Sequence, residues 1–372
     1  MEAQKVIAEK SYSKADYKEK VTAEKKYLLI GILILIAVLL ASVILAILAG
    51  PVDISVERAL QVVYYNTFKV FMESNAGLSS GISYDIIWGL RLPRVLMAAL
   101  IGMGLSVIGV VMQAMVKNPL ANPYTLGISS GASLGATFAI MIGVGSVFGP
   151  HFIGVAAFLG ALLSSITVYS IANIGGGRSS SIKLLLSGMA VSALCSAFSS
   201  FIIFIASDVQ GMRTLTFWLM GSLVSASWEN ILIPAVILIS GLFYFITQFR
   251  NLNMMLIGDE SAVTLGTNLN YYRKIYIVIT SLMTGMIVYV AGTIGFVGLI
   301  IPHIVRAIVG TEHKKLISYS ALTGAIFLIW TDVLARSVIQ GTEMPIGIIT
   351  SLLGAPFFIW ILIRKTYGFG GN

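Results

Sequence analysis

Arginines at the ends of apolar segments are the residues of this chain whose type and spacing best fit a binding role. The string Arg91-Leu92-Pro93-Arg94 begins one long apolar segment, and Arg336 lies near the end of another. Pro93 fits the first turn of a helix, where the amide hydrogen that proline lacks would have no partner. The two guanidinium groups can bind an anion or a protein carboxylate through paired hydrogen bonds. The alternative is that they only anchor the helix at a membrane surface.

Asp332 precedes Arg336 by four residues. Acidic and basic side chains at this spacing meet on one face of a helix. The simplest interpretation of these two residues is therefore an ion pair within one helix.

A second candidate is the segment Gly258-Asp259-Glu260-Ser261-Ala262-Val263-Thr264-Leu265-Gly266. Asp259 can cap the free amides of a new helix, and Gly266 can end that helix in the left-handed conformation. The pattern predicts a helix of about two turns. Such a helix is either a contact surface for another protein or a simple connection between two longer helices.

Motifs for enzymatic chemistry are missing from the sequence. The string Gly175-Gly176-Gly177-Arg178-Ser179-Ser180-Ser181 lacks the Lys of a phosphate-binding loop, and there is no His-Glu-x-x-His. Cys195 is the single cysteine, and the three histidines lie far apart in sequence, so no metal or redox site is expected. We therefore predict a chain that is not an enzyme and binds no cofactor itself.

The composition indicates an all-α integral membrane protein. Of the 372 residues, 57% are hydrophobic and 11% are charged, whereas soluble domains have about 25% charged residues. A bilayer core about 30 Å thick needs about 20 apolar helical residues, and long uncharged runs recur along the chain. About ten transmembrane helices in one bundle are expected, at residues 27–50, 92–116, 125–148, 152–173, 182–206, 229–249, 274–291, 296–309, 316–335 and 345–364. Residues 212–228 are expected to form a bent or re-entrant piece.

Basic residues favour a topology with both termini in the cytoplasm. One set of loops holds 18 of the 24 Lys and Arg, and an excess of these residues is typical of the cytoplasmic side. The expected parts are a charged cytosolic tail at 1–26, a membrane domain at 27–366, an extracellular segment at 51–90 and a cytosolic loop at 250–273. The first apolar run is too long for a cleaved signal peptide.

Few carboxylates fall within the expected membrane helices. Asp332 and Glu229 lie near helix ends, whereas carriers driven by protons or sodium usually hold ionisable groups at the membrane centre. A secondary carrier or a channel is thus the less favoured class.

Gly127, Gly131 and Gly135 repeat at four-residue spacing, which predicts close packing of two helices.

Several strings together resemble the FecCD family of permeases, which belong to type II ABC importers for iron-siderophore complexes, haem and cobalamin. The resemblance covers about residues 30–365. The matching strings are Arg91–Arg94, Gln113 through Asn118–Ala121 to Leu126–Ala132, Trp218–Leu223, Gly258–Glu260 to Leu265–Gly266, Gly295–Leu299 to Pro302–Arg306, and Pro345–Ile348 to Leu353–Pro356.

The resemblance implies a set of partners in a prokaryotic cell membrane. These are a second permease subunit, identical or related, two cytosolic ATP-binding subunits that carry ATP and Mg, and an extracytoplasmic substrate-binding protein. It also implies that Arg91, Arg94 and Arg336 receive glutamates of the binding protein. The segment from Gly258 would be the coupling helix for the ATPase, with candidate residues Gly258, Asp259, Glu260, Ala262, Leu265 and Gly266.

In this family the substrate passes along the axis between two permease subunits. That implies a pathway lined by Ser187, Gly188, Ser192, Ser196, Ser199 and Ser200, with a gate around Gly175, Gly176 and Gly177. Serines at helical spacing also serve packing. The expected cargo is a metal chelate, with iron-siderophore first and cobalamin or haem as alternatives. The long tail at 1–26 and the extended segment at 51–90 depart from the family pattern.

Overall fold

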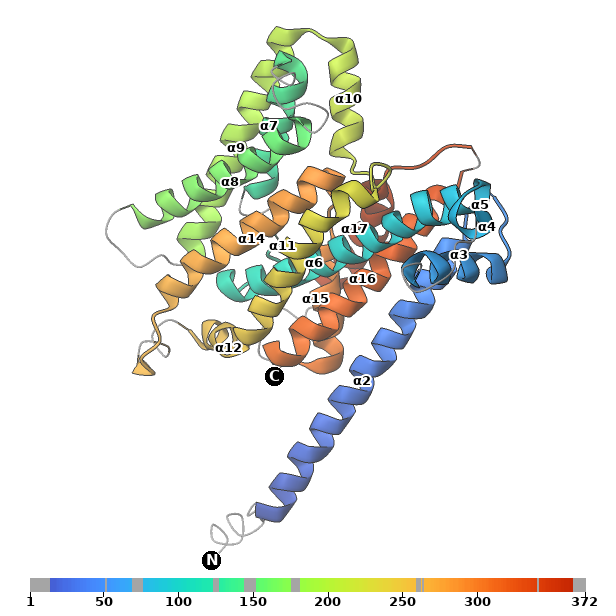
Figure 1. Ribbon diagram of the computed structural model, residues 1–372. Helices are drawn as coiled ribbons and strands as arrows, with labels where there is room; N and C mark the ends of the chain where they lie inside the picture. Colours follow the sequence, from blue (N-terminus) through green and yellow to red (C-terminus); the bar gives the residue numbers. More distant parts are fainter. Residues whose placement is uncertain are drawn as a thin grey trace, which may run out of the picture.

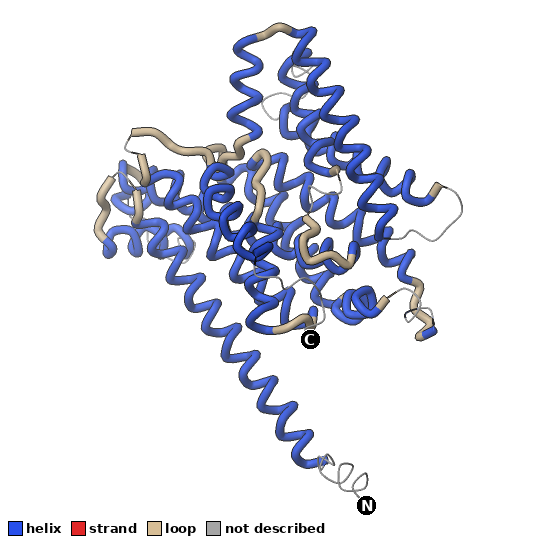
Figure 2. Tube along the Cα trace, turned by 180° about the vertical axis from the view of Figure 1, so that it is seen from behind, coloured by secondary structure: helices blue, strands red, loops and turns tan. Residues whose placement is uncertain are grey.

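The computed structural model describes residues 14–50, 52–68, 76–122, 127–143, 152–174, 181–258, 262, 264–339 and 341–363. All regular structure in these ranges is helical, with no strand (Figures 1 and 2). In chain order the elements are α2 (Lys14–Leu48), α3 (Val56–Phe68), α4 (Ala76–Ser79), α5 (Ile82–Tyr84), the π-helical η2 (Asp85–Arg91), α6 (Leu92–Val116), α7 (Ile128–Ile142), α8 (Phe152–Asn173), α9 (Ser181–Ala206), α10 (Val209–Leu219), α11 (Trp228–Thr247), α12 (Phe249–Ile257), α14 (Leu269–Ala291), α15 (Val297–Val309), α16 (His313–Ser337) and α17 (Ile346–Ile363).

Each of the expected apolar segments contains a helix, which confirms the all-helical membrane class. Within the described residues, seven helices are long and apolar enough to cross a membrane: Lys26–Leu48, Ile82–Val116, Phe152–Asn173, Ile182–Ala206, Trp228–Thr247, Leu269–Ala291 and His313–Ser337. Three further apolar helices, α7, α15 and α17, are shorter. The number of crossings and the side of the termini stay predictions.

The start of the second long helix differs from the expectation. Pro93 lies in the first turn of α6, as expected, but α6 continues directly from α5 and η2 instead of starting afresh. The amide of Leu92 bonds to the carbonyl of Ile87, which is the spacing of a π-helix. Such one-turn π-helical insertions occur often at functional sites. Here the insertion positions Arg91 and Arg94 inside a continuous helix.

The expected bent piece at 212–228 consists of a helix and a turn. Asp208 accepts a hydrogen bond from the amide of Gln210 and so caps α10. After α10 the chain runs through Gly221, whose carbonyl accepts a hydrogen bond from Ile346 at the start of α17. Ser222 donates its amide hydrogen to Ala291 at the end of α14. This turn therefore supplies partners for the ends of two other helices.

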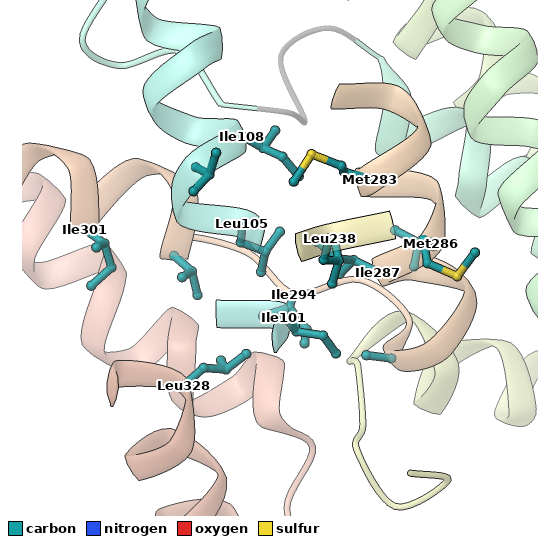
Figure 3. Close-up of a cluster of buried hydrophobic side chains, with 14 of the residues drawn as sticks. Ile101, Leu105, Ile108, Leu238, Met283, Met286, Ile287, Ile294, Ile301 and Leu328 are labelled. Carbon is teal, nitrogen blue, oxygen red and sulfur yellow. The ribbon is translucent and has the colours of Figure 1, made fainter. Parts of the chain in front are cut away.

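Helix α6 is the centre of the bundle. In the apolar window of the segment Ile82–Val116, 78% of the residues are buried inside the protein. Figure 3 shows Ile101, Leu105 and Ile108 of α6 among side chains from α11, α14, α15 and α16. The helix is apolar on all sides, as expected for a helix that other helices surround.

Glycines set the closest helix contacts. A Cβ atom on Gly102 would clash with the carbonyl of Gly324 in α16, and one on Gly109 would clash with Gly298 in α15. Between α7 and α8, Gly131 and Gly160 face each other in the same way. The close packing predicted from the glycine spacing of α7 is thus confirmed, and it follows the small-residue rule for membrane helices.

Helix α2 lies along the edge of the bundle (Figure 1). Only 6% of its membrane window is buried. Side chains of α16 hold it at three levels: Tyr319 bonds to the carbonyl of Leu28, Trp330 bonds to Ser42, and Arg336 bonds to the last turn of α2. Polar contacts therefore fix a helix that has little packing of its own.

Candidate functional site

Arg91, Arg94 and Arg336 meet at one end of the bundle. Arg91 is the last residue of η2, Arg94 lies in the first turn of α6, and Arg336 lies in the last turn of α16. All three line a pocket of about 730 Å³, together with Glu343. These four residues and Asp332 are called the arginine cluster below.

Two carboxylates neutralise part of the arginine cluster. Arg94 donates from Nε to Asp332 Oδ1 at 2.9 Å and from Nη1 to Glu343 Oε2 at 2.7 Å. Arg336 Nε lies 3.3 Å from Asp332 Oδ2, so the predicted pair within one helix is confirmed. The side chain of Asp332 is 1% exposed, whereas that of Glu343 is 48% exposed. Asp332 is therefore a buried anion between two guanidinium groups.

Arg91 and Arg336 also cap the end of α2. The last four carbonyls of a helix have no partner within the helix, and cations near them are favourable. The guanidinium groups donate to carbonyls at the end of α2 and just beyond it. The bonds run from Arg91 to Ile47 (2.9 Å), Leu48 (3.0 Å) and Val52 (2.8 Å), and from Arg336 to Ala46 (2.6 Å) and Ala49 (2.8 Å). Both arginines thus join α2 to the bundle.

These internal bonds leave little of the three arginines exposed. Arg91 is 6% exposed, and the side chains of Arg94 and Arg336 are 13% and 6% exposed. Asp332 and Glu343 pair with Arg94 and Arg336, and the carboxylate of Asp53 interacts electrostatically with Arg91, so the three positive charges beside the open pocket face three negative ones. The role in binding-protein docking stays a prediction, because every guanidinium already has a partner inside the chain.

Sequence reasoning found the Asp332–Arg336 pair but missed the contacts of Arg94, because its partners lie 238 and 249 residues away. One signal pointed to them. A carboxylate near the end of an apolar helix needs basic partners, and Arg94 was already expected at the same end of the bundle.

The described part of the expected coupling segment follows α12 (Phe249–Ile257), whose Asn253 bonds to the first residue of α16. The amide of Ala262 bonds to the carbonyl of Gly258 at 3.0 Å, and Gly266 has a φ of 76°, which confirms the expected left-handed end. Ala262 is fully buried, whereas Leu265 is 66% exposed. Asp259 and Glu260 lie outside the described residues. The exposed Leu265 is available for contact with another protein.

Helix α12 was not expected. The loop predicted at 250–273 contains it, and its Leu252 and Met255 are fully buried. Their spacing of three residues is the helical signal that was available. Polar neighbours such as Arg250 and Asn251 interrupt this apolar pattern, so the helix was not predicted. The segment from Gly258 therefore follows a helix that is packed into the bundle.

The expected pathway residues on α9 have mixed surroundings. Ser187 and Gly188 are buried, and the carbonyl of Gly188 faces Gly127 of α7. Ser192 and Ser199 are half-buried, and Ser196 and Ser200 are exposed. A lining role for all six residues stays a prediction. Gly175, Gly176 and Gly177 of the expected gate lie outside the described residues.

A metal site was not expected from the sequence. Among the residues that the structure describes, no three His, Cys, Asp or Glu side chains form a group that could hold a metal ion. Cys195 is buried and not in a disulfide.

Comparison with known proteins gives consistent matches over most of the chain. The uncharacterised ABC transporter permease protein YvrB of Bacillus subtilis is 38% identical over 331 residues, which is 89% of this chain and 92% of YvrB. The hemin transport system permease protein HmuU of Yersinia pestis is 38% identical and covers 75% of this chain and 84% of its own. The cobalamin import system permease protein BtuC of Halobacterium salinarum is 40% identical, with 74% of this chain and 73% of BtuC covered.

The fold also matches a solved structure. A transporter assigned to the metal-chelate type of ABC transporters, in an inward-facing conformation, aligns with a TM-score of 0.76 and 28% identity. The alignment covers 90% of this chain and 98% of that one. The sequence model of the FecCD transport family matches residues 37–364. This chain therefore belongs to the FecCD transport family.

Proposed function

We propose that this chain is the permease subunit of an ABC importer for a metal chelate, with an iron-siderophore complex as the first candidate. The match to the FecCD transport family over residues 37–364 carries the proposal. Two of the relatives are named as permeases for hemin and for cobalamin. Both molecules are metal chelates, and they are the alternative cargoes.

ATP hydrolysis has to come from partner subunits in this proposal, because the sequence has no phosphate-binding loop. The complex would contain a second permease subunit, two cytosolic ATP-binding subunits and an extracytoplasmic binding protein. The positive-inside rule supports cytoplasmic termini. The segment from Gly258 then faces the ATP-binding subunits, and the arginine cluster faces the binding protein.

The central experiment is uptake by the complex of this chain with its partner subunits, reconstituted in proteoliposomes. We expect ATP-dependent uptake that stops when the Walker Lys of the ATP-binding subunit is replaced by Ala. Uptake that survives this change and collapses with a protonophore would refute the proposal in favour of a secondary carrier. Comparing a ferric siderophore, hemin and cobalamin as cargoes tests the substrate class.

Docking of the binding protein at Arg91, Arg94 and Arg336 is the second part of the proposal. The open pocket that all three arginines line supports it. Charge reversal of the arginines themselves is a poor test, because their internal bonds would be lost together with any docking contact. A residue on the rim of the same pocket is a better target.

Ile339 lines this pocket and is 48% exposed. Ile339→Glu and Ile339→Lys remove the same apolar side chain and add opposite charges. Charges at the rim of an interface act mainly on the association rate. If acidic groups of the binding protein dock here, the Lys variant should associate faster than the wild type and the Glu variant more slowly, with both differences fading at high salt. Equal rates for the two variants would refute electrostatic docking.

A further inference from the structure

Helix α12 is fastened to the first turn of α16 through Asn253. Asn253 Oδ1 accepts a hydrogen bond from the backbone amide of His313 at 3.0 Å and lies 2.7 Å from His313 Nδ1. The backbone amide can only donate, so the side-chain amide of Asn253 must present its oxygen. That oxygen can only accept, so Nδ1 of His313 carries the proton. The two residues, called the Asn253–His313 latch below, fix each other's orientation.

The latch is partly buried and replaces a local cap. His313 is 1% exposed and is the first residue of α16. Glu312 precedes it at the N-cap position, but its side chain makes no capping bond. The first amides of a helix need partners from outside the helix. α16 thus takes one of these partners from α12, which lies 60 residues earlier in the chain.

Further contacts support the latch on both sides. The Nζ atom of Lys314 lies 5.8 Å from the centre of the Phe249 ring, within range of a cation–π interaction. Gln248, the N-cap residue of α12, accepts a hydrogen bond from the hydroxyl of Tyr276 in α14. The position of α12 is therefore set against two long helices.

The two ends of the latch lead to the two proposed contact sites. α12 ends at Ile257, and the helical turn of the coupling segment begins at the next residue, Gly258. On the other side, α16 runs without a proline from His313 to Asp332 and Arg336 of the arginine cluster. With a rise of 1.5 Å per residue, His313 and Asp332 are roughly 28 Å apart along the helix axis.

We infer that Asn253 and His313 are positioning residues that transmit movement of the coupling segment to α16, and through α16 to the arginine cluster. This inference rests on the proposed function. A displacement of Gly258 moves α12, and the latch transmits this displacement to the first turn of α16. The unbroken helix α16 then transmits the displacement to Asp332. Elements that have two discrete arrangements carry coupling of this kind between distant sites.

The test measures a response at the far end of α16. A spin label at Ile339→Cys, in a Cys195→Ser background, reports on the arginine cluster in the complex with the ATP-binding subunits. The probe is the ATP analogue AMP-PNP with Mg²⁺, and the readout is the change in the EPR line shape. Asn253→Ala breaks the latch, and Asn253→Asp keeps an oxygen acceptor. Asn251→Ala is the matched control, because the side chain of Asn251 bonds to Gln248 and to Tyr276 of α14 and takes no part in the latch.

We expect AMP-PNP to change the spectrum of the labelled parent, the Asn253→Asp variant and the Asn251→Ala variant, and to leave that of Asn253→Ala unchanged. A full response in Asn253→Ala would overturn the inference and leave the proposed function intact. Absence of any response in the parent complex, together with absence of ATP-dependent uptake, would overturn both. A purely structural role for Asn253 predicts a lower unfolding temperature with an unaltered nucleotide response, so that outcome also counts against the latch.

Discussion

Removal of the Asp332 carboxylate should be the most damaging single change in the arginine cluster. Asp332 is 1% exposed, bonds to Arg94 at 2.9 Å and pairs with Arg336 at 3.3 Å. Asp332→Ala leaves Arg336 without a carboxylate and leaves Arg94 with the exposed Glu343 alone. Breaking a buried ion pair on one side costs about 3–5 kcal/mol, because the remaining charge stays buried without its partner.

Glu343 of the arginine cluster provides a comparison for this free-energy cost. Glu343 pairs with the same arginine, but its side chain is 48% exposed, and exposed pairs contribute about 0–1 kcal/mol. Asp332→Asn keeps an oxygen for Arg94 and loses only the charge, so its effect should fall between the two. The expected order of destabilisation is Asp332→Ala, then Asp332→Asn, then Glu343→Ala.

Equilibrium unfolding in mixed micelles with rising SDS, followed by tryptophan fluorescence, measures the free energy of unfolding of each variant. A double-mutant cycle of Asp332→Asn with Arg94→Gln isolates the energy of the pair. A loss below about 1 kcal/mol for Asp332→Ala, or equal losses for Asp332→Ala and Glu343→Ala, would refute the conclusion that burial makes this carboxylate essential.

Two further changes test the packing and the coupling segment. Gly109→Ala should destabilise the protein by about 1–3 kcal/mol, because the new methyl group meets the backbone of Gly298. The control in the same unfolding assay is Gly89→Ala, because Gly89 has open space around it. Leu265→Asp should leave the unfolding free energy nearly unchanged, because Leu265 is 66% exposed, but should weaken co-purification of the ATP-binding subunits; an intact complex with normal uptake would contradict a coupling role.

Local patterns were enough to predict the long apolar helices. Uncharged runs of about 20 residues identify membrane helices because backbone groups in lipid must bond within their own segment. The glycine spacing of α7 and the four-residue spacing of Asp332 and Arg336 are equally local, and both contacts exist in the structure. In each case the sequence pattern lies along one face of one helix.

Local patterns did not predict the bonds between residues that lie far apart in the sequence. The bonds of Arg91 to the end of α2 and of Arg94 to Asp332 join residues 39 to 238 positions apart, and no local pattern specifies them. The π-helical stretch before Leu92 was missed for a related reason, since its sequence is compatible with an ordinary helix or a loop. Tertiary contacts decide between those conformations.

Burial separates residues that fix the position of α16 from residues that have room to contact other proteins. Asp332 and His313 are each 1% exposed and bond to other helices, so their first effect is to fix where α16 lies. Leu265 and Glu343 are exposed and have room for contacts with other proteins. A charged residue at the mouth of a permease therefore cannot be assigned to docking from its position alone. Substitution of an exposed neighbour separates docking from folding, because it alters the surface charge without removing a buried bond.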